Sequence, residues 1–209
     1  MRLHILVEGP SEEAFLEGWL GRFLPPGHTF KIIRHRGKGR LPRESQARPD
    51  PKRQGLLDQL PAKLRAYGRT LNATTDRLLV LVDQDEENCE ELKERLLEAW
   101  HFCQPRPEAL FRIAIEELEA FYLGDSEAIR RAYPKMKVGP LRDYEQDSVC
   151  GTWELFMEVI GAASEDKVAW ARKMGQELGI RWQGARANRS PSFQQFCTGL
   201  LQLAGEPGA

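Results

Sequence analysis

The sequence predicts an α/β fold in which a parallel sheet is flanked by helices and followed by a helical carboxyl-terminal extension. Short apolar runs alternate with segments of helical periodicity, which is typical of a parallel sheet with helical connections. Three of these apolar runs end in carboxylates. We expect an α/β domain over residues 1–135 and helices packed on it over residues 136–209, and the two parts can also form one domain.

The first predicted strand, Arg2–Val7, is followed directly by Glu8 and a Gly-Pro turn. The next segment, Ala14–Leu24, has apolar residues at helical spacing and is expected to form a helix. Ser11 is the predicted N-cap of this helix, and Glu12 suits the positive end of the helix dipole. Glu8 has no such capping use, so a carboxylate at the end of this apolar strand indicates a function.

A basic segment begins within the second predicted strand, Thr29–Ile33. From Lys31 to Arg69 it contains twelve lysines and arginines against three acidic residues, and it ends in a helix predicted over Gly55–Tyr67. Cations beside a carboxylate site can hold a phosphate backbone. The residues predicted to bind nucleic acid are Arg34, Arg36, Lys38 and Arg40. The alternative is a loop whose charges are only solvated.

The third predicted strand, Arg77–Val82, carries the strongest single signal. It contains five consecutive apolar residues, which is typical of a strand buried on both faces of a parallel sheet. Asp83 and Asp85 follow it, at the sheet edge where open α/β folds place their sites. Side chains two apart on a strand point the same way, so both can bind one hard cation. Alternatively, Asp85 or Asn88 only caps the helix Cys89–Trp100.

The fourth predicted strand, Leu110–Ile115, also leads into acidic residues. Glu117 and Glu119 lie where the strand gives way to an apolar helix. A solvated helix start explains one or two such carboxylates, but it does not explain why three strands all end in them. Clustered carboxylates repel one another unless a cation neutralises them, and Mg²⁺ and Mn²⁺ prefer oxygen ligands. The sequence therefore predicts Mg²⁺ or Mn²⁺ as a cofactor.

The last third of the chain is predicted to be helical. Helices are expected over Thr152–Ile160 and over Ser164–Leu178, with Ser164 as the cap of the second. A third helix begins with Ser190 as N-cap and a proline after it. Lys167 and Arg189 are candidate auxiliary phosphate contacts. The aromatic residues of these helices are predicted to lie in the core rather than to stack on bases: Trp153, Trp170, Phe193 and Phe196.

The order of these motifs resembles the Toprim domain. A strand followed by Glu-Gly-X-Ser-Glu and a helix, a later strand ending in Asp-X-Asp, and a further acidic strand end all occur in this order. Val7–Leu16 is similar to the first motif of the overcoming-lysogenisation-defect (OLD) nucleases. Ile113–Phe121 and Asn188–Phe193 resemble the later motifs of small stand-alone bacterial Toprim-like proteins of uncharacterised function.

The resemblance implies a Toprim-like fold and nuclease activity that depends on Mg²⁺ or Mn²⁺. The metal ligands that it implies are Glu8, Glu12, Asp83, Asp85, Glu117 and Glu119. Glu8, Asp83 and Asp85 would be catalytic, with Glu8 as a metal ligand or a general acid/base. Asn88 stands where many Toprim domains have glycine, and the tyrosine domain of topoisomerases and the zinc module of primases are absent. Phosphodiester cleavage is therefore expected rather than topoisomerase or primase activity.

Partners follow from the same resemblance. OLD nucleases carry an ATPase in the same chain, so a separately encoded ATPase partner, in phage defence, is expected here. The expected substrate is nucleic acid, with DNA favoured over RNA. The alternatives are a non-catalytic module that binds nucleic acid or an ATPase, an RNA-maturation nuclease and, less favoured, a phosphatase.

Composition adds little to these predictions. The formal net charge is −1, and the four cysteines form no Cys-X-X-Cys pair, so neither a zinc site nor a disulfide framework is predicted. No secretory signal precedes the first strand, and no apolar run approaches membrane length. A cytoplasmic protein without membrane contact is expected.

Overall fold

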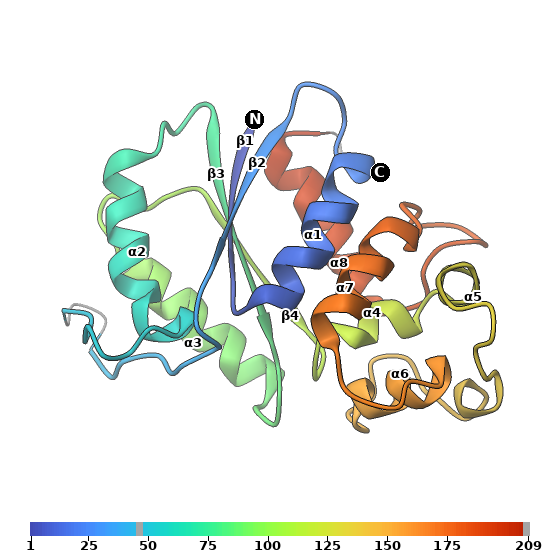
Figure 1. The fold of residues 1–209 in the computed structure, drawn as a ribbon. Helices are drawn as coiled ribbons and strands as arrows, with labels where there is room; N and C mark the ends of the chain where they lie inside the picture. Colours follow the sequence, from blue (N-terminus) through green and yellow to red (C-terminus); the bar gives the residue numbers. More distant parts are fainter. Residues whose placement is uncertain (45–47, 207–209) are drawn as a thin grey trace.

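The computed structural model of the protein describes residues 1–44 and 48–206 and confirms the predicted α/β architecture (Figure 1). Within these residues, one sheet of four parallel strands has the order β2-β1-β3-β4. The strands are β1 (Arg2–Val7), β2 (Thr29–Arg34), β3 (Asp76–Asp83) and β4 (Ala109–Ala114). Each strand end lies within one residue of its prediction, because the apolar runs that define these strands are short and sharply bounded.

Helices cover both faces of the sheet. The helices are α1 (Pro10–Phe23), α2 (Leu56–Thr70), α3 (Cys89–His101), α4 (Glu119–Leu123), α5 (Ser126–Ala132), α6 (Thr152–Ile160), α7 (Lys167–Glu177) and α8 (Pro191–Ala204). A short 3₁₀ helix spans Gly139–Leu141. No helix within the described residues combines the length and the apolar character needed to cross a membrane. Figure 1 shows α2 and α3 on one face, and α1 with the carboxyl-terminal helices on the other.

The inner strand β3 explains why helices cover both faces of the sheet. Leu79 and Leu81 pack in the core on the α1 face, whereas Leu78, Val80 and Val82 pack against α2 and α3. All five side chains are fully buried. Side chains alternate between the two faces of a strand, so a continuous apolar run needs cover on both.

The carboxyl-terminal helices share the core of the α1 face rather than forming a separate one. Helix α7 lies along α1 at a close approach, because Gly18 and Gly175 leave no side chain between the two backbones. Trp19 stacks on Phe23 and contacts Phe193 of α8. As predicted, aromatic residues of the extension are core residues, with Trp153 half-buried at its edge.

Helix starts show where local sequence reasoning was right and where it was wrong. Asn88 caps α3 by accepting the N–H groups of Glu90 and Glu91, so Asp85 is not the cap. The prediction that Ser11 caps α1 was wrong. The helix begins two residues earlier, at Pro10, with Gly9 as N-cap, because proline is pre-organised for the first helical position.

Helix α7, in contrast to α1, starts later than predicted. It begins at Lys167, and the side chain of Asp166, rather than that of Ser164, accepts the N–H of Ala169. Helix α8 has the predicted cap, since the Oγ of Ser190 accepts the N–H of Phe193. The later start of α7 places Lys167 in its first turn.

Candidate functional site

The ends of β1 and β3 are joined through two of the predicted site residues. Glu8 follows the last residue of β1, and its Oε1 accepts the backbone N–H of Asp83, the last residue of β3, over 2.9 Å. Parallel neighbouring strands end at the same edge of a sheet, so the register brings the two acidic residues together. Glu8 is only 8% exposed.

Asp83 lies among carboxylates from several elements. Burial raises the pKa of Asp83 well above its ordinary value, and the nearby charges raise it further, in the order Glu12, Glu8, Glu119 and Glu117. Its Oδ1 is buried and has no hydrogen-bond partner among the described residues. We call these five residues the carboxylate cluster. They come from the ends of β1 and β3, the start of α1, the β4–α4 connection and the first residue of α4.

Two members of the carboxylate cluster have a pKa shifted to near neutrality. Burial raises the pKa of Glu8 to about 8, although the hydrogen bond from the Asp83 N–H opposes the rise. Burial likewise raises the pKa of Glu119 to about 8, and Lys167 opposes that rise. Glu119 is 2% exposed, and its Oε1 is buried without a partner among the described residues. Such desolvated carboxylates favour either a proton or a bound cation.

Glu12 has a structural use in addition to its place in the cluster. One side-chain oxygen accepts the N–H of Gly9 over 2.8 Å, and the other accepts the hydroxyl of Ser11 over 3.0 Å. The first contact satisfies a free backbone group at the start of α1. Glu12 therefore stabilises the turn that follows Glu8.

Tyr122 is a neighbour of the cluster that sequence reasoning missed. Its side chain is fully buried, and its hydroxyl has no hydrogen-bond partner within the described part of the chain. Burial raises the pKa of Tyr122 well above its ordinary value, and the charges of Glu119, Glu12 and Asp83 add to the rise. In the sequence it is one aromatic residue in an apolar helix, so no pattern distinguished it from an ordinary core residue.

Asp85 lies at the rim of the cluster, but not for the predicted reason. Strand β3 ends at Asp83, and Asp85 has a left-handed backbone with φ 53°, so the alternation of strand side chains does not set its direction. Its N–H bonds to the carbonyl of Glu116, and its side chain is 47% exposed. Burial is the main cause that raises the pKa of Glu8 and of Glu117, and the charge of Asp85 adds to both.

Lys38 reaches this rim from the basic segment. Its Nζ lies 2.9 Å from Oδ2 of Asp85 and 3.0 Å from Oε1 of Glu87, and it donates to the carbonyl of Gln84 over 2.9 Å. The side chain is only 10% exposed. A side chain at Gly39, where φ is 69°, would run into Asp58. The loop is thus shaped to insert the ammonium group beside the carboxylates.

The other residues predicted to bind nucleic acid divide into two kinds. Arg34 forms an ion pair of 3.0 Å with Glu13. Arg36 and Arg40 are exposed, and no side-chain hydrogen bond or ion pair is recorded for either within the described residues. Since Lys38 and Arg34 already have carboxylate partners, Arg36 and Arg40 are the members of the set that can contact phosphates without breaking an ion pair.

Lys167 approaches the cluster from the other side. In the first turn of α7, its Nζ lies 2.6 Å from Oε2 of Glu117 and 5.0 Å from the ring centre of Trp153. The second auxiliary candidate, Arg189, instead lines a shallow depression with Asp125. Two lysines therefore neutralise carboxylates at the outside of the site. For the inner residues Glu8, Asp83 and Glu119, no ion pair is found within the described residues.

Glu116 holds the β4–α4 connection in place. It has a left-handed backbone with φ 59°, and its carboxylate accepts the N–H groups of Gly151 and Thr152, each over 2.8 Å. These groups start α6 and have no intrahelical partner. The connection that carries Glu117 and leads into Glu119 is consequently tied to α6.

A cation would have to displace existing contacts in this arrangement. Over residues 1–44 and 48–206, no three His, Cys, Asp or Glu side chains are already arranged to hold a metal ion. Asp85 and Glu117 are bound by lysines, and one oxygen of Glu8 accepts a backbone N–H. The chemistry of the cluster, all oxygen donors, nevertheless fits a hard cation such as Mg²⁺ or Mn²⁺.

Comparison with known proteins gives one match. Residues 7–201 match the model of a family described as a domain of unknown function, DUF4276. No curated protein and no solved structure matches the chain. The matched range contains the whole carboxylate cluster and both lysines that border it. The resemblance to Toprim domains and OLD nucleases stays a prediction.

Proposed function

The chain belongs to the DUF4276 family, whose description assigns no activity, and we propose from its site that it hydrolyses nucleic-acid phosphodiesters with Mg²⁺ or Mn²⁺ as cofactor. The observation that carries this proposal is the convergence of five carboxylates, with buried oxygen atoms of Asp83 and Glu119 that have no partner among the described residues. Burying carboxylates without charge partners is unfavourable for folding, so a functional site is the simplest explanation of this cluster.

The residues that would hold the cofactor are Glu8, Glu12, Asp83, Asp85, Glu117 and Glu119. A divalent ion at such a site polarises a phosphoryl oxygen and lowers the pKa of a bound water. The geometry also suggests the order in which these carboxylates would bind the ion. Asp83 and Glu119 offer free buried oxygens, whereas Asp85 and Glu117 must first release Lys38 and Lys167.

The side chains around the cluster suit the rest of the chemistry. If Glu8 does not hold the ion, its pKa of about 8 suits proton exchange at neutral to mildly alkaline pH, and it is then the proposed general base. Once released from their carboxylates, Lys38 and Lys167 can offset the charge that develops on a phosphoryl group. Arg36 and Arg40 would hold the polyanion, because their side chains are exposed.

Two further parts of this proposal rest on the resemblance to OLD nucleases. They are a preference for DNA over RNA and a separately encoded ATPase partner in phage defence. A search for an adjacent ATPase gene, followed by co-purification of the two products, tests the partner. The carboxylate chemistry does not require that partner.

The function is tested by a cleavage assay. The purified chain is incubated with plasmid, single-stranded DNA and RNA, with Mg²⁺, with Mn²⁺ and with a chelator. We expect cleavage that needs the divalent ion and that falls at least about 100-fold in Asp83→Asn. Glu17→Gln, which changes an exposed carboxylate of α1, is the control and should cleave normally. Equal cleavage by wild type and Asp83→Asn would refute the proposal.

A further inference from the structure

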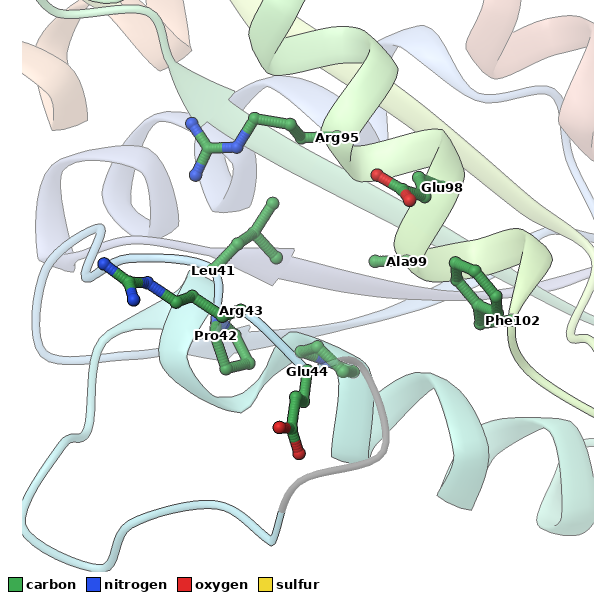
Figure 2. Close-up of a pocket in the computed structure, with 9 residues that line it drawn as sticks. Leu41, Pro42, Arg43, Glu44, Arg95, Glu98, Ala99 and Phe102 are labelled. Carbon is green, nitrogen blue, oxygen red and sulfur yellow. The ribbon is translucent and has the colours of Figure 1, made fainter.

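A groove with a volume of about 560 Å³ lies between the basic segment, α2 and α3 (Figure 2). Its walls combine apolar and charged side chains, and the six that matter here are Leu41, Arg43, Pro61, Arg95, Glu98 and Phe102. We call it the Phe102 groove. None of the residues predicted to form the site from sequence lies in it.

Phe102 gives the groove its most unusual feature. The ring follows the last turn of α3 and is 58% exposed, and it is the only aromatic residue among the large apolar side chains exposed in the described residues. Leu41 and Pro61 line the groove with it, so a flat apolar group could lie between them and the ring. An exposed aromatic face of this kind is a platform on which any nucleobase can stack.

Cations occupy the other end of the groove. In Figure 2 the guanidinium groups of Arg43 and Arg95 lie on the side away from the Phe102 ring. Arg95 and Phe102 are seven residues apart on one helix, which corresponds to roughly 10 Å along its axis. The carboxylate of Glu98 lies between them along the helix and can accept a hydrogen bond from an exocyclic amino group of a base.

A chain of ion pairs connects the groove to Asp85, at the rim of the carboxylate cluster. Arg95 pairs with Glu87 over 2.8 Å, Glu87 pairs with Lys38 over 3.0 Å, and Lys38 pairs with Asp85 over 2.9 Å. Arg95 is therefore two ion pairs away from Lys38 and three away from Asp85, and these contacts lead from the groove to the rim of the cluster.

We propose that the Phe102 groove binds the single-stranded nucleic acid that flanks the cleaved phosphodiester, with a base on Phe102 and backbone phosphates on Arg43 and, once it is released from Glu87, on Arg95. This inference rests on the proposed function and names its substrate class. Nucleic acid is favoured over an apolar peptide because the groove adjoins the basic segment and leads to the cluster. A single strand is favoured over a duplex because only unpaired bases can present their faces to an aromatic ring.

Equilibrium binding tests this inference separately from cleavage. Fluorescence anisotropy with the full chain in a chelator compares a labelled oligodeoxynucleotide of about 12 nucleotides with its duplex. Phe102→Ala should weaken single-strand binding about tenfold and leave duplex binding unchanged, whereas Phe102→Trp should bind like wild type. Arg172→Ala, an exposed cation on α7 across the sheet, is the control and should have no effect.

A second measurement examines the phosphate contacts. Arg43→Ala should reduce the slope of log affinity against log salt by about 0.7 for the single strand. Because Phe102 and Arg43 are exposed, circular dichroism of both variants should match wild type. Absence of single-strand binding by wild type, or full binding by Phe102→Ala, would overturn the inference. If wild type still cleaves with metal although the binding result overturns the inference, the proposed function stands. If wild type does not cleave but Phe102→Ala weakens single-strand binding, the inference about the groove stands and the proposed function fails.

Discussion

The ammonium group of Lys38 lies 2.9 Å from the carboxylate of Asp85, at the place where the sequence predicts a bound cation. The lysine comes from the connection between β2 and α2, and the aspartate follows β3. Gly37 and Gly39 have left-handed backbones on either side of Lys38, which fixes the loop that presents it. The protein therefore supplies its own cation to the outside of the carboxylate cluster.

Competition between this lysine and a metal ion gives the first prediction. Lys38→Gln should raise the affinity for Mn²⁺ about fivefold, because the ion no longer has to displace an ammonium group worth about 1 kcal/mol. Isothermal titration calorimetry measures the change. Lys52→Gln, an exposed lysine of the same segment, should leave the affinity as it is. A weaker Mn²⁺ affinity in Lys38→Gln would show that the lysine supports the ion instead.

The raised pKa of Glu8 makes stability depend on pH. Its folded pKa of about 8 lies above the ordinary value of 4.5, so the folded state binds more protons than the unfolded state between those values. In a chelator, the free energy of unfolding should therefore fall as pH rises from about 5 to about 8. Glu8→Gln should fall less steeply over this range in urea titrations. Identical slopes for the two proteins would contradict the shift.

Tyr122→Phe should not destabilise the protein. The hydroxyl is buried without a partner among the described residues, so removing it should leave the free energy of unfolding unchanged or raise it by about 1 kcal/mol. Tyr144→Phe is the contrast, because that hydroxyl accepts the N–H of Asp147 over 3.3 Å and its loss should cost about 1 kcal/mol. Urea denaturation in a chelator compares the two. A clear loss of stability in Tyr122→Phe would mean that the hydroxyl is bonded.

The contact of α7 with α1 should be intolerant of added volume. A side chain at Gly175 would run into the backbone of Phe15, so Gly175→Ala should destabilise the protein by about 1–3 kcal/mol. Gly21→Ala, in the same helix as Phe15 but with open space around it, should stabilise it by up to about 1 kcal/mol. Urea midpoints of the two variants should move in opposite directions. A shift in the same direction would show that the helices separate easily.

The fold was predictable because its signals are local. The five apolar residues before Asp83 required burial on both faces, and the helices that provide it follow from periodicity. The wrong caps at Ser11 and Ser164 have a shared cause. The actual caps, Gly9 and Asp166, each lie two residues from the predicted one, and only the packed structure selects between such neighbouring candidates.

The site was predictable in its carboxylates and in the two lysines beside them, Lys38 and Lys167, but not in the ion pairs that these lysines form. Glu8 and Asp83 end neighbouring strands, so topology alone brings them together. The ion pair of Lys38 depends on how a long loop folds back over the sheet edge, and no local pattern encodes that path. Tyr122 had no signal of its own, because its place beside the cluster depends on the packing of α4 against α1 and not on its neighbours in sequence.

The central claim is that the carboxylate cluster binds a divalent cation, and calorimetric titration of the full chain with Mn²⁺ tests it most directly. Wild type should bind Mn²⁺ saturably, and Asp83→Asn, which removes the carboxylate at the centre of the cluster, should bind it at least about tenfold more weakly. Glu17→Gln should bind like wild type. Saturable binding that is equal in wild type and Asp83→Asn, or no binding by wild type, would contradict the claim.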